Sequence, residues 1–101
     1  MKDWRNYKAR IDELMNVLDS TISGIDIDYE LKTPEDEDFD PSLRVPYILL
    51  KYYADEEHEY ERKIELFEYY FDKPTQETAK LITDMVEEFL MEIDQSLYGG
   101  G

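Results

Sequence analysis

The chain has 101 residues, of which 42% are hydrophobic and 14% aromatic, enough to bury the core of a single domain. It has no cysteine, which excludes a disulfide framework and a thiolate zinc site. Eleven basic residues stand against 26 acidic ones, and the net charge of −15 opposes direct binding to nucleic-acid phosphates and to anionic membranes.

The first two predicted elements are a helix over residues 3–22 and a short strand over residues 25–31. Apolar side chains recur in the helix at steps of three and four residues: Trp4, Tyr7, Ile11, Leu14, Met15, Leu18 and Ile22. Asp3 is a suitable N-cap, and Gly24 is a suitable stop. In the strand, apolar and acidic residues alternate strictly, a pattern typical of a half-buried strand.

The next segment, TPEDEDFDPSL at residues 33–43, is strongly acidic. Asp36, Asp38 and Asp40 alternate as the first ligands of an EF-hand calcium loop do. Such a loop also needs glycine at its sixth position and glutamate at its twelfth, where this chain has Pro41 and Tyr47. We therefore predict no metal site here. We interpret the segment as a long contact loop that is mobile in the isolated protein.

Two longer strands and a helix are predicted in the second half of the chain. VPYILLKYY at residues 45–53 is apolar on both faces, which indicates a central strand. HEYERKIELFEYYF at residues 58–71 changes parity near Leu66 and Phe67, which predicts a β-bulge or a contact of its far half with a second subunit. The last helix, over residues 75–97, has an apolar stripe: Ala79, Ile82, Met85, Val86, Phe89, Leu90, Ile93 and Leu97.

The order helix, strand, strand, strand, helix predicts an α+β fold of the αβββα type. We expect a three-stranded antiparallel sheet with both helices on one face. It forms a single domain over residues 1–98, with the acidic loop at 33–43 and a flexible glycine tail at 99–101. The N-terminal ten residues lack a signal-peptide core and the apolar runs are too short for a membrane span, so we expect a soluble cytoplasmic protein.

No residue pattern points to catalysis. His58 is the only histidine, and the chain has neither a cysteine nucleophile nor a glycine-rich phosphate loop. The sequence therefore predicts no enzyme, no catalytic residue, no cofactor and no small-molecule substrate. It predicts a protein partner instead, which is either a second copy of the chain in a homo-oligomer or a basic protein surface.

Acidic and tyrosine side chains are the candidate contact residues. The tyrosines are concentrated on the two long strands. When helices cover one face of a small sheet, its other face is left to solvent. We therefore expect a partner to cover part of the tyrosines. The candidate partner-binding residues are Glu35, Asp36, Glu37, Asp38, Phe39, Asp40, Tyr47, Tyr52, Tyr53, Tyr60, Tyr69 and Tyr70.

The layout of residues 3–93 resembles the tail-terminator, or tail-completion, proteins of tailed bacteriophages. The segments that carry the resemblance are Ile25–Leu31, the acidic loop, Val45–Leu50, Glu61–Phe71 and the helix after Lys73–Pro74. The resemblance implies a ring-forming, homo-oligomeric virion component of the tail or neck, whose loop orders against neighbouring subunits. Its location is then the host-cell cytoplasm and, after assembly, the virion.

The same order of elements is also similar to that of small acidic phage inhibitors of the anti-CRISPR and anti-restriction types. Some of these mimic DNA, because carboxylates spaced like phosphates compete for a basic nucleic-acid-binding groove. The carboxylates that could form such a strip lie at residues 26–30, in the acidic loop and at residues 55–65. A small regulatory or chaperone-like subunit is a third interpretation, and the sequence leaves these alternatives open.

Overall fold

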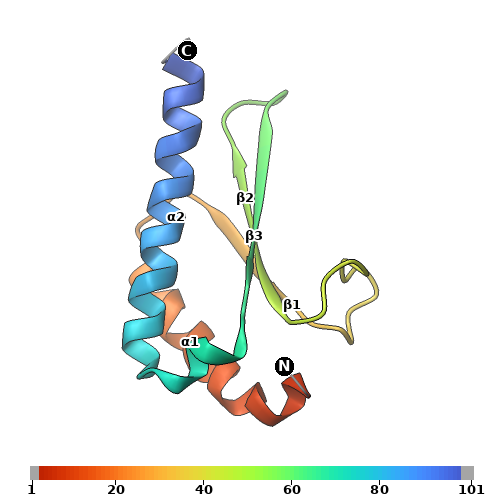
Figure 1. Ribbon diagram of the computed structural model, residues 1–101. Coiled ribbons are helices and arrows are strands. Elements are labelled where there is room, and N and C mark those ends of the chain that lie inside the picture. Colours follow the sequence, from red (N-terminus) through yellow and green to blue (C-terminus); the bar gives the residue numbers. More distant parts are fainter. Residues whose placement is uncertain (1–2, 99–101) are drawn as a thin grey trace.

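The computed structural model describes residues 3–98, and it confirms the predicted αβββα order (Figure 1). The chain begins with a 3-10 turn, η1, and ends in a long helix, α2, and a second 3-10 turn, η2, follows the sheet. The elements are η1 (Trp4–Tyr7), α1 (Lys8–Thr21), β1 (Asp28–Lys32), β2 (Tyr47–Tyr53), β3 (Glu59–Glu65), η2 (Glu68–Asp72) and α2 (Thr75–Tyr98). None of the helices within residues 3–98 combines the length and the apolar character needed to cross a bilayer. The glycine tail expected at 99–101 lies outside the described residues.

The three strands form an antiparallel sheet in the order β1-β2-β3, with β2 at the centre as predicted. Leu31 of β1 lies opposite Ile48 of β2, and Ile48 lies opposite Ile64 of β3. Because side chains alternate along a strand, this register separates two faces. The inner face carries Tyr29, Leu31, Ile48, Leu50, Tyr52, Tyr60, Arg62 and Ile64. The outer face carries Asp28, Glu30, Lys32, Tyr47, Leu49, Lys51, Tyr53, Glu59, Glu61, Lys63 and Glu65.

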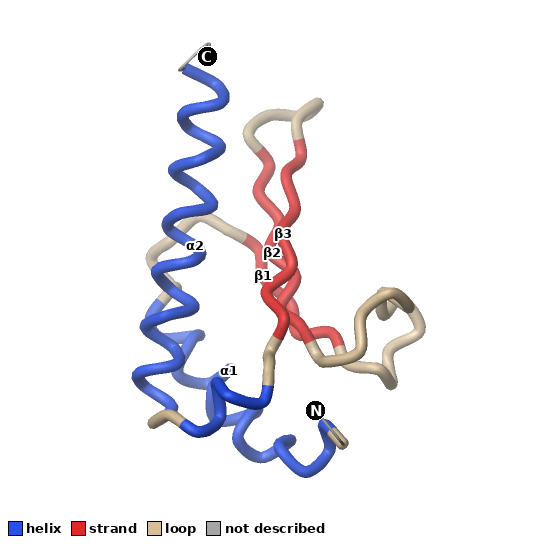
Figure 2. Tube along the Cα trace, viewed as in Figure 1, coloured by secondary structure: helices blue, strands red, loops and turns tan. Residues whose placement is uncertain are grey.

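Both helices lie on the inner side of the sheet, and they run in the same general direction, with α1 inclined to α2 (Figure 2). Near the start of α1, Arg10 donates from Nη2 to the carbonyl oxygen of Lys73 at 2.9 Å, just before α2 begins. At the end of α1, the hydroxyl oxygens of Thr21 and Thr83 are 3.3 Å apart. The core between helices and sheet consists of Ile11, Leu14, Leu18, Ile48, Leu50, Ile64, Leu66, Phe71, Ala79, Ile82, Val86, Phe89 and Ile93.

The predicted long strand over 58–71 is wrong in its second half. β3 ends at Glu65, and the chain then turns into η2. This turn buries Tyr70 and Phe71 in the protein and leaves Phe67 and Tyr69 exposed. The change of parity near Leu66 therefore marks the end of the strand, and it is not a bulge within it.

The first strand and the first helix are also shorter than predicted. Ile25 and Ile27 donate backbone hydrogen bonds to the carbonyls of Ile22 and Ile25, so residues 25–27 form turns and β1 begins only at Asp28. Residues 4–7 of the expected helix form η1, which Asp3 caps by accepting from the backbone N–H of Arg5 at 3.0 Å. Alternation of apolar and acidic residues predicted the strand, but local turn bonds shorten it.

Candidate protein-interaction site

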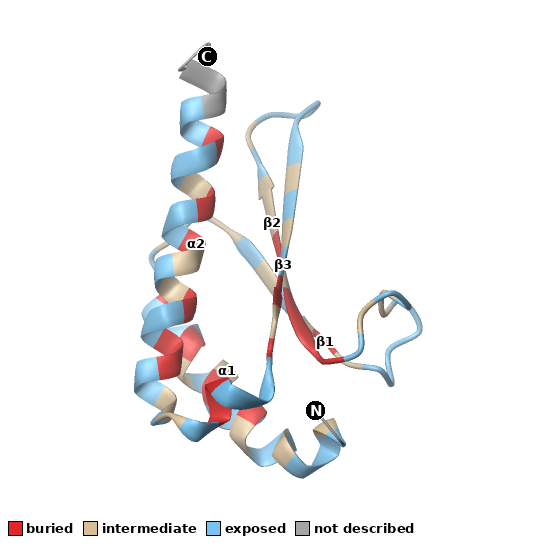
Figure 3. Cartoon of the chain, in the orientation of Figure 1, coloured by how far each residue is buried: buried red, intermediate tan, exposed pale blue. Residues whose placement is uncertain are grey.

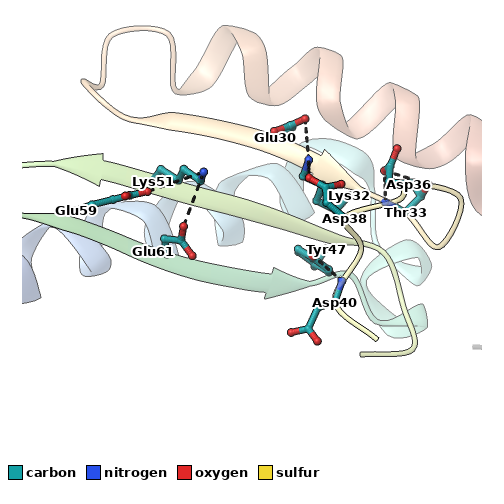
Figure 4. A network of polar contacts seen from close by, with 10 residues as sticks. All are labelled: Glu30, Lys32, Thr33, Asp36, Asp38, Asp40, Tyr47, Lys51, Glu59 and Glu61. Carbon is teal, nitrogen blue, oxygen red and sulfur yellow. Dashed lines mark hydrogen bonds and ion pairs between the residues drawn. The ribbon is translucent and has the colours of Figure 1, made fainter. Parts of the chain in front are cut away.

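The acidic loop, residues 33–43, is fastened to the outer face of the sheet (Figure 4). Asp38 accepts from Lys32 of β1, with 2.7 Å between Oδ2 and Nζ, and Glu30 lies 3.0 Å from the same ammonium. Asp40 accepts from Lys63 of β3, also at 2.7 Å. The loop therefore spans the sheet from one edge strand to the other and is held by an ion pair at each edge.

An aromatic contact holds the middle of the loop against β2. The rings of Phe39 and Tyr47 lie 5.2 Å apart, and the Lys63 ammonium lies 5.6 Å from the centre of the Tyr47 ring. The Tyr47 hydroxyl oxygen accepts from the backbone N–H of Asp40 at 3.1 Å. Tyr47 is 2% exposed as a result, so the sequence wrongly assigned it to a contact surface. Its position on the outer face would leave it open to solvent if the loop did not cover it.

The ion pairs shift the pKa values of the loop groups in the directions expected for charged partners. The bond from Lys63, followed by bonds from Ser42, lowers the pKa of Asp40 to about 2. The bond from Lys32 lowers the pKa of Asp38, and the bonds to Asp38 and Glu30 raise the pKa of Lys32. These carboxylates are already engaged within the chain, which reduces what they can offer to a partner.

The remaining acids of the loop point elsewhere. Glu35 accepts from Arg5 Nε at 3.0 Å, and Asp36 accepts from the backbone N–H of Thr33 at 2.7 Å. Glu37 is exposed. Asp36, Asp38 and Asp40 thus bond to three different partners and do not converge. Within residues 3–98, no group of three or more His, Asp or Glu side chains is placed to hold a metal ion.

The predicted tyrosines do not form one surface. Tyr70 is 7% exposed and belongs to the interior, where burial raises its pKa to about 12, so it too was wrongly assigned to a contact surface. Tyr52 and Tyr60 lie opposite each other on the inner face and are half-buried. Tyr53 on the outer face and Tyr69 in η2 are each 54% exposed. The accessible tyrosines therefore lie on separate parts of the molecule.

Phe67 and Tyr69 form an exposed aromatic pair beside η2. Their rings stack at 6.0 Å, and Phe67 is 40% exposed. A hollow of about 560 Å³ lies against them and is bounded by Glu68 and Asp72. Phe67 and Tyr69 therefore leave an aromatic surface uncovered beside η2.

Away from the loop, the outer face carries alternating charges. Lys51 at the centre of the sheet lies 3.9 Å from Glu59 and 3.8 Å from Glu61, measured between Nζ and Oε1. Opposite charges on neighbouring strands contribute weakly to sheet stability at an exposed surface. An open hollow of about 490 Å³ runs along Leu49, Lys51 and Tyr53. This part of the sheet is uncovered, but its charges are largely paired.

The turn between β2 and β3 is capped by Asp55. Its carboxylate accepts from the backbone N–H groups of Glu57 and His58 at 2.8 and 2.9 Å, and it also bonds to His58 Nδ1 at 2.8 Å. The only histidine of the chain therefore serves this turn. Glu56 and Glu57 are exposed at the tip of the hairpin.

A cleft that the sequence did not indicate lies between the hairpin and the second half of α2. It has a volume of about 440 Å³. The residues that line it are Asp26, Tyr52, Ala54, Leu90, Met91, Ile93 and Asp94. Met91 is 62% exposed, the highest value among the exposed large hydrophobic residues. One sequence signal existed: Met91 falls outside the apolar stripe of the helix, so an apolar side chain faces solvent there.

Comparisons with protein families, with curated proteins and with solved structures found no match for this chain.

Proposed function

We propose that this chain is a non-catalytic interaction protein whose partner presents a basic surface. The observation that carries this proposal is the distribution of charge. Most of the lysines and arginines in the described part of the chain already form ion pairs within it: Arg5, Arg10, Lys32, Lys51, Arg62, Lys63 and Lys80. With a net charge of −15, the excess carboxylates are left without a cation.

Several of these carboxylates gather at one end of the molecule. We call this the distal end: it comprises the hairpin turn at residues 54–58 and the C-terminal half of α2, which extend in the same direction in Figure 1. The exposed acids there that pair with no described cation are Glu56, Glu57, Glu87, Glu88 and Asp94. Asp26, from the segment between α1 and β1, lines a cleft together with Asp94 and adds to this surface. Such a surface attracts a basic partner and accelerates its association.

A basic nucleic-acid-binding groove is one surface of this kind. In that version the protein acts as a DNA mimic, as anti-CRISPR and anti-restriction inhibitors do. The internal pairing of Asp38 and Asp40 removes the acidic loop as the main mimic of phosphates. In the proposal, the carboxylates of the distal end mimic the phosphates instead.

Retention of proteins from an extract of the source organism tests the proposal. The full chain is immobilised beside two variants that remove the same number of charges. The distal variant carries Glu56→Gln, Glu57→Gln and Glu87→Gln, and the control carries Asp12→Asn, Glu37→Gln and Glu77→Gln. We expect a defined basic protein to be retained by the wild type and the control, and lost by the distal variant. Equal retention by the two variants, or no basic protein retained, would contradict the proposal.

We propose homo-oligomeric assembly, as in a virion tail or neck component, as the second candidate function. The exposed pair Phe67 and Tyr69 supports it, because stacked aromatics at a surface are common in subunit interfaces. Sedimentation velocity over a wide concentration range tests it. We expect an oligomer that Phe67→Ser with Tyr69→Ser converts to a monomer. A wild-type chain that stays monomeric at the highest concentration contradicts this candidate.

A further inference from the structure

The layer of helices over the sheet is incomplete at the distal end. α1 ends at Thr21, whose hydroxyl lies beside that of Thr83. α2 continues to Tyr98, which is about 22 Å beyond Thr83 at the helical rise of about 1.5 Å per residue. Within residues 3–98, α2 is therefore the only helix over the distal part of the hairpin. Figure 3 shows the consequence, since burial is concentrated where α1, α2 and the sheet meet and declines toward the hairpin turn.

The cleft at this place has apolar walls and an acidic rim. Leu90 and Met91 of α2 form one wall, and Tyr52 and Ala54 form the other. A carboxylate stands on each side, Asp26 from the segment after α1 and Asp94 from α2. Glu87 adds to the rim, because it is seven residues before Asp94 and therefore on the same side of the helix.

We propose that this cleft binds a basic amphipathic helix of a partner protein. The inference rests on the proposed function, because it names the segment by which a basic partner is held. A helix suits the uncovered part of the layer, because helices cover the inner face of the sheet in a fold of this kind. A bound helix places apolar side chains against Tyr52, Leu90 and Met91, and its lysines or arginines face Asp26 and Asp94. A second copy of the chain is a poor occupant of this cleft, because most of its described lysines and arginines are already paired and few are left to face Asp26 and Asp94.

Fluorescence anisotropy with a synthetic peptide tests this inference. The probe is a labelled helix of leucine and lysine, about 15 residues long to span the uncovered length, with leucine at helical spacing. The matched control peptide replaces every lysine with glutamate. The protein variants are Met91→Glu and Asp94→Lys in the cleft, and Asp12→Lys as the charge-matched control. Asp12 is exposed on α1, outside the distal end. Circular dichroism verifies that each variant is folded.

We expect the leucine–lysine peptide to bind the wild type, and each cleft variant to lower its affinity by about tenfold. The two variants change the charge in opposite directions. Met91→Glu adds a negative charge, so binding by overall charge alone predicts a slightly tighter complex for it. Weakening by Met91→Glu, with Asp12→Lys close to wild type, is therefore specific to an apolar contact in the cleft.

The other outcomes separate this inference from the proposed function. If Asp94→Lys and Asp12→Lys weaken binding equally and Met91→Glu does not, the peptide binds by overall charge; the cleft is overturned and the proposed function stands. If the leucine–glutamate peptide binds as tightly as the leucine–lysine peptide, the cleft inference and the proposed function are both overturned. If neither peptide binds, the cleft inference is overturned, and retention of basic proteins decides the proposed function. A dimer in sedimentation that Met91→Glu dissociates makes a second copy the occupant and overturns the inference.

Discussion

Lys32 and Asp38 close the acidic loop onto the first strand, with 2.7 Å between the ammonium nitrogen and the carboxylate oxygen. The Lys32 side chain is only 9% exposed, while that of Asp38 is 67% exposed. The lysine thus lies beneath the loop and draws an exposed acid toward the sheet. Together with the pair of Lys63 and Asp40 on the opposite edge, it converts a highly acidic segment into an ordered cover of Tyr47.

We expect Lys32→Met to loosen this loop without unfolding the domain. The methionine keeps the apolar stem, but Asp38 and Glu30 then face each other without the cation that joins them. Amide hydrogen exchange at residues 36–42 should accelerate by about tenfold, which corresponds to the loss of a charged hydrogen bond. Lys51→Met is the control, because it removes the same charge but its ion pairs join β2 to β3, at Glu59 and Glu61, and do not hold the loop. Equal exchange in both variants would show that Lys32 does not hold the loop.

Stability should decrease below about pH 4 in part because of Asp40. The carboxyl of an unfolded aspartate has a pKa near 3.9, whereas the bond from Lys63 lowers the pKa of Asp40 to about 2 in the folded protein. Its stabilising contribution is therefore complete above about pH 4 and is lost as the pH decreases through about 2. Between pH 5 and pH 2, the melting temperature measured by thermal unfolding should decrease less for Asp40→Asn than for the wild type. Parallel curves would exclude a contribution from this pair.

Much of the fold was predictable because burial repeats with the period of each element. Apolar residues at three- and four-residue steps located both helices. Alternation located the first and third strands, and a run that is apolar on both faces located the central one. The end of β3 was not predictable from alternation, because Tyr70 and Phe71 are buried by a turn rather than by a strand. A strand and a short 3-10 turn both leave some neighbouring residues buried and others exposed, so the burial pattern of a few residues does not distinguish them.

The contact residues were harder to predict, because their environment depends on distant parts of the chain. Asp40 appeared as one acid in a run, but its partner Lys63 is 23 residues away. Tyr47 has the pattern of an exposed strand residue until the loop covers it. The cleft arises from the lengths and offset of α1 and α2, which are 14 and 24 residues long. Local periodicity does not encode that offset.

Thr78→Val should destabilise the domain by about 1–3 kcal/mol. The Thr78 hydroxyl donates to the carbonyl oxygen of Tyr70 at 2.6 Å, and Thr78 is 2% exposed. Valine has the same shape but leaves this buried carbonyl without the donor. Urea denaturation measures the change in the free energy of unfolding. Thr78→Ser keeps the hydroxyl, so we expect it to lose less stability. A serine variant as unstable as the valine variant would assign the effect to packing and not to the hydrogen bond.

Arg62→Met should free the distal hairpin from α2. Arg62 Nη2 donates to Glu92, and its guanidinium lies 5.1 Å from the centre of the Phe89 ring, so one side chain joins β3 to the part of α2 beyond α1. The methionine retains an apolar contact with Phe89 but loses both charged interactions. We expect faster amide exchange in residues 51–62 and 88–95, while β1 keeps its protection, because the core at Leu50 and Ile64 is unaffected.

The same variant distinguishes a preformed cleft from one that forms on binding. Arg62 projects from β3 toward Glu92, and neither residue lines the cleft. A preformed cleft requires that the hairpin and α2 are held in place before the helix binds. In that case Arg62→Met lowers the affinity for the leucine–lysine peptide, because the hairpin and α2 then have to be ordered during binding. Glu92→Gln is the matched control, since it removes a negative charge but keeps a hydrogen-bond acceptor for Arg62. Weaker binding with Arg62→Met and near wild-type binding with Glu92→Gln supports a preformed cleft, and equal binding by both variants and the wild type contradicts it.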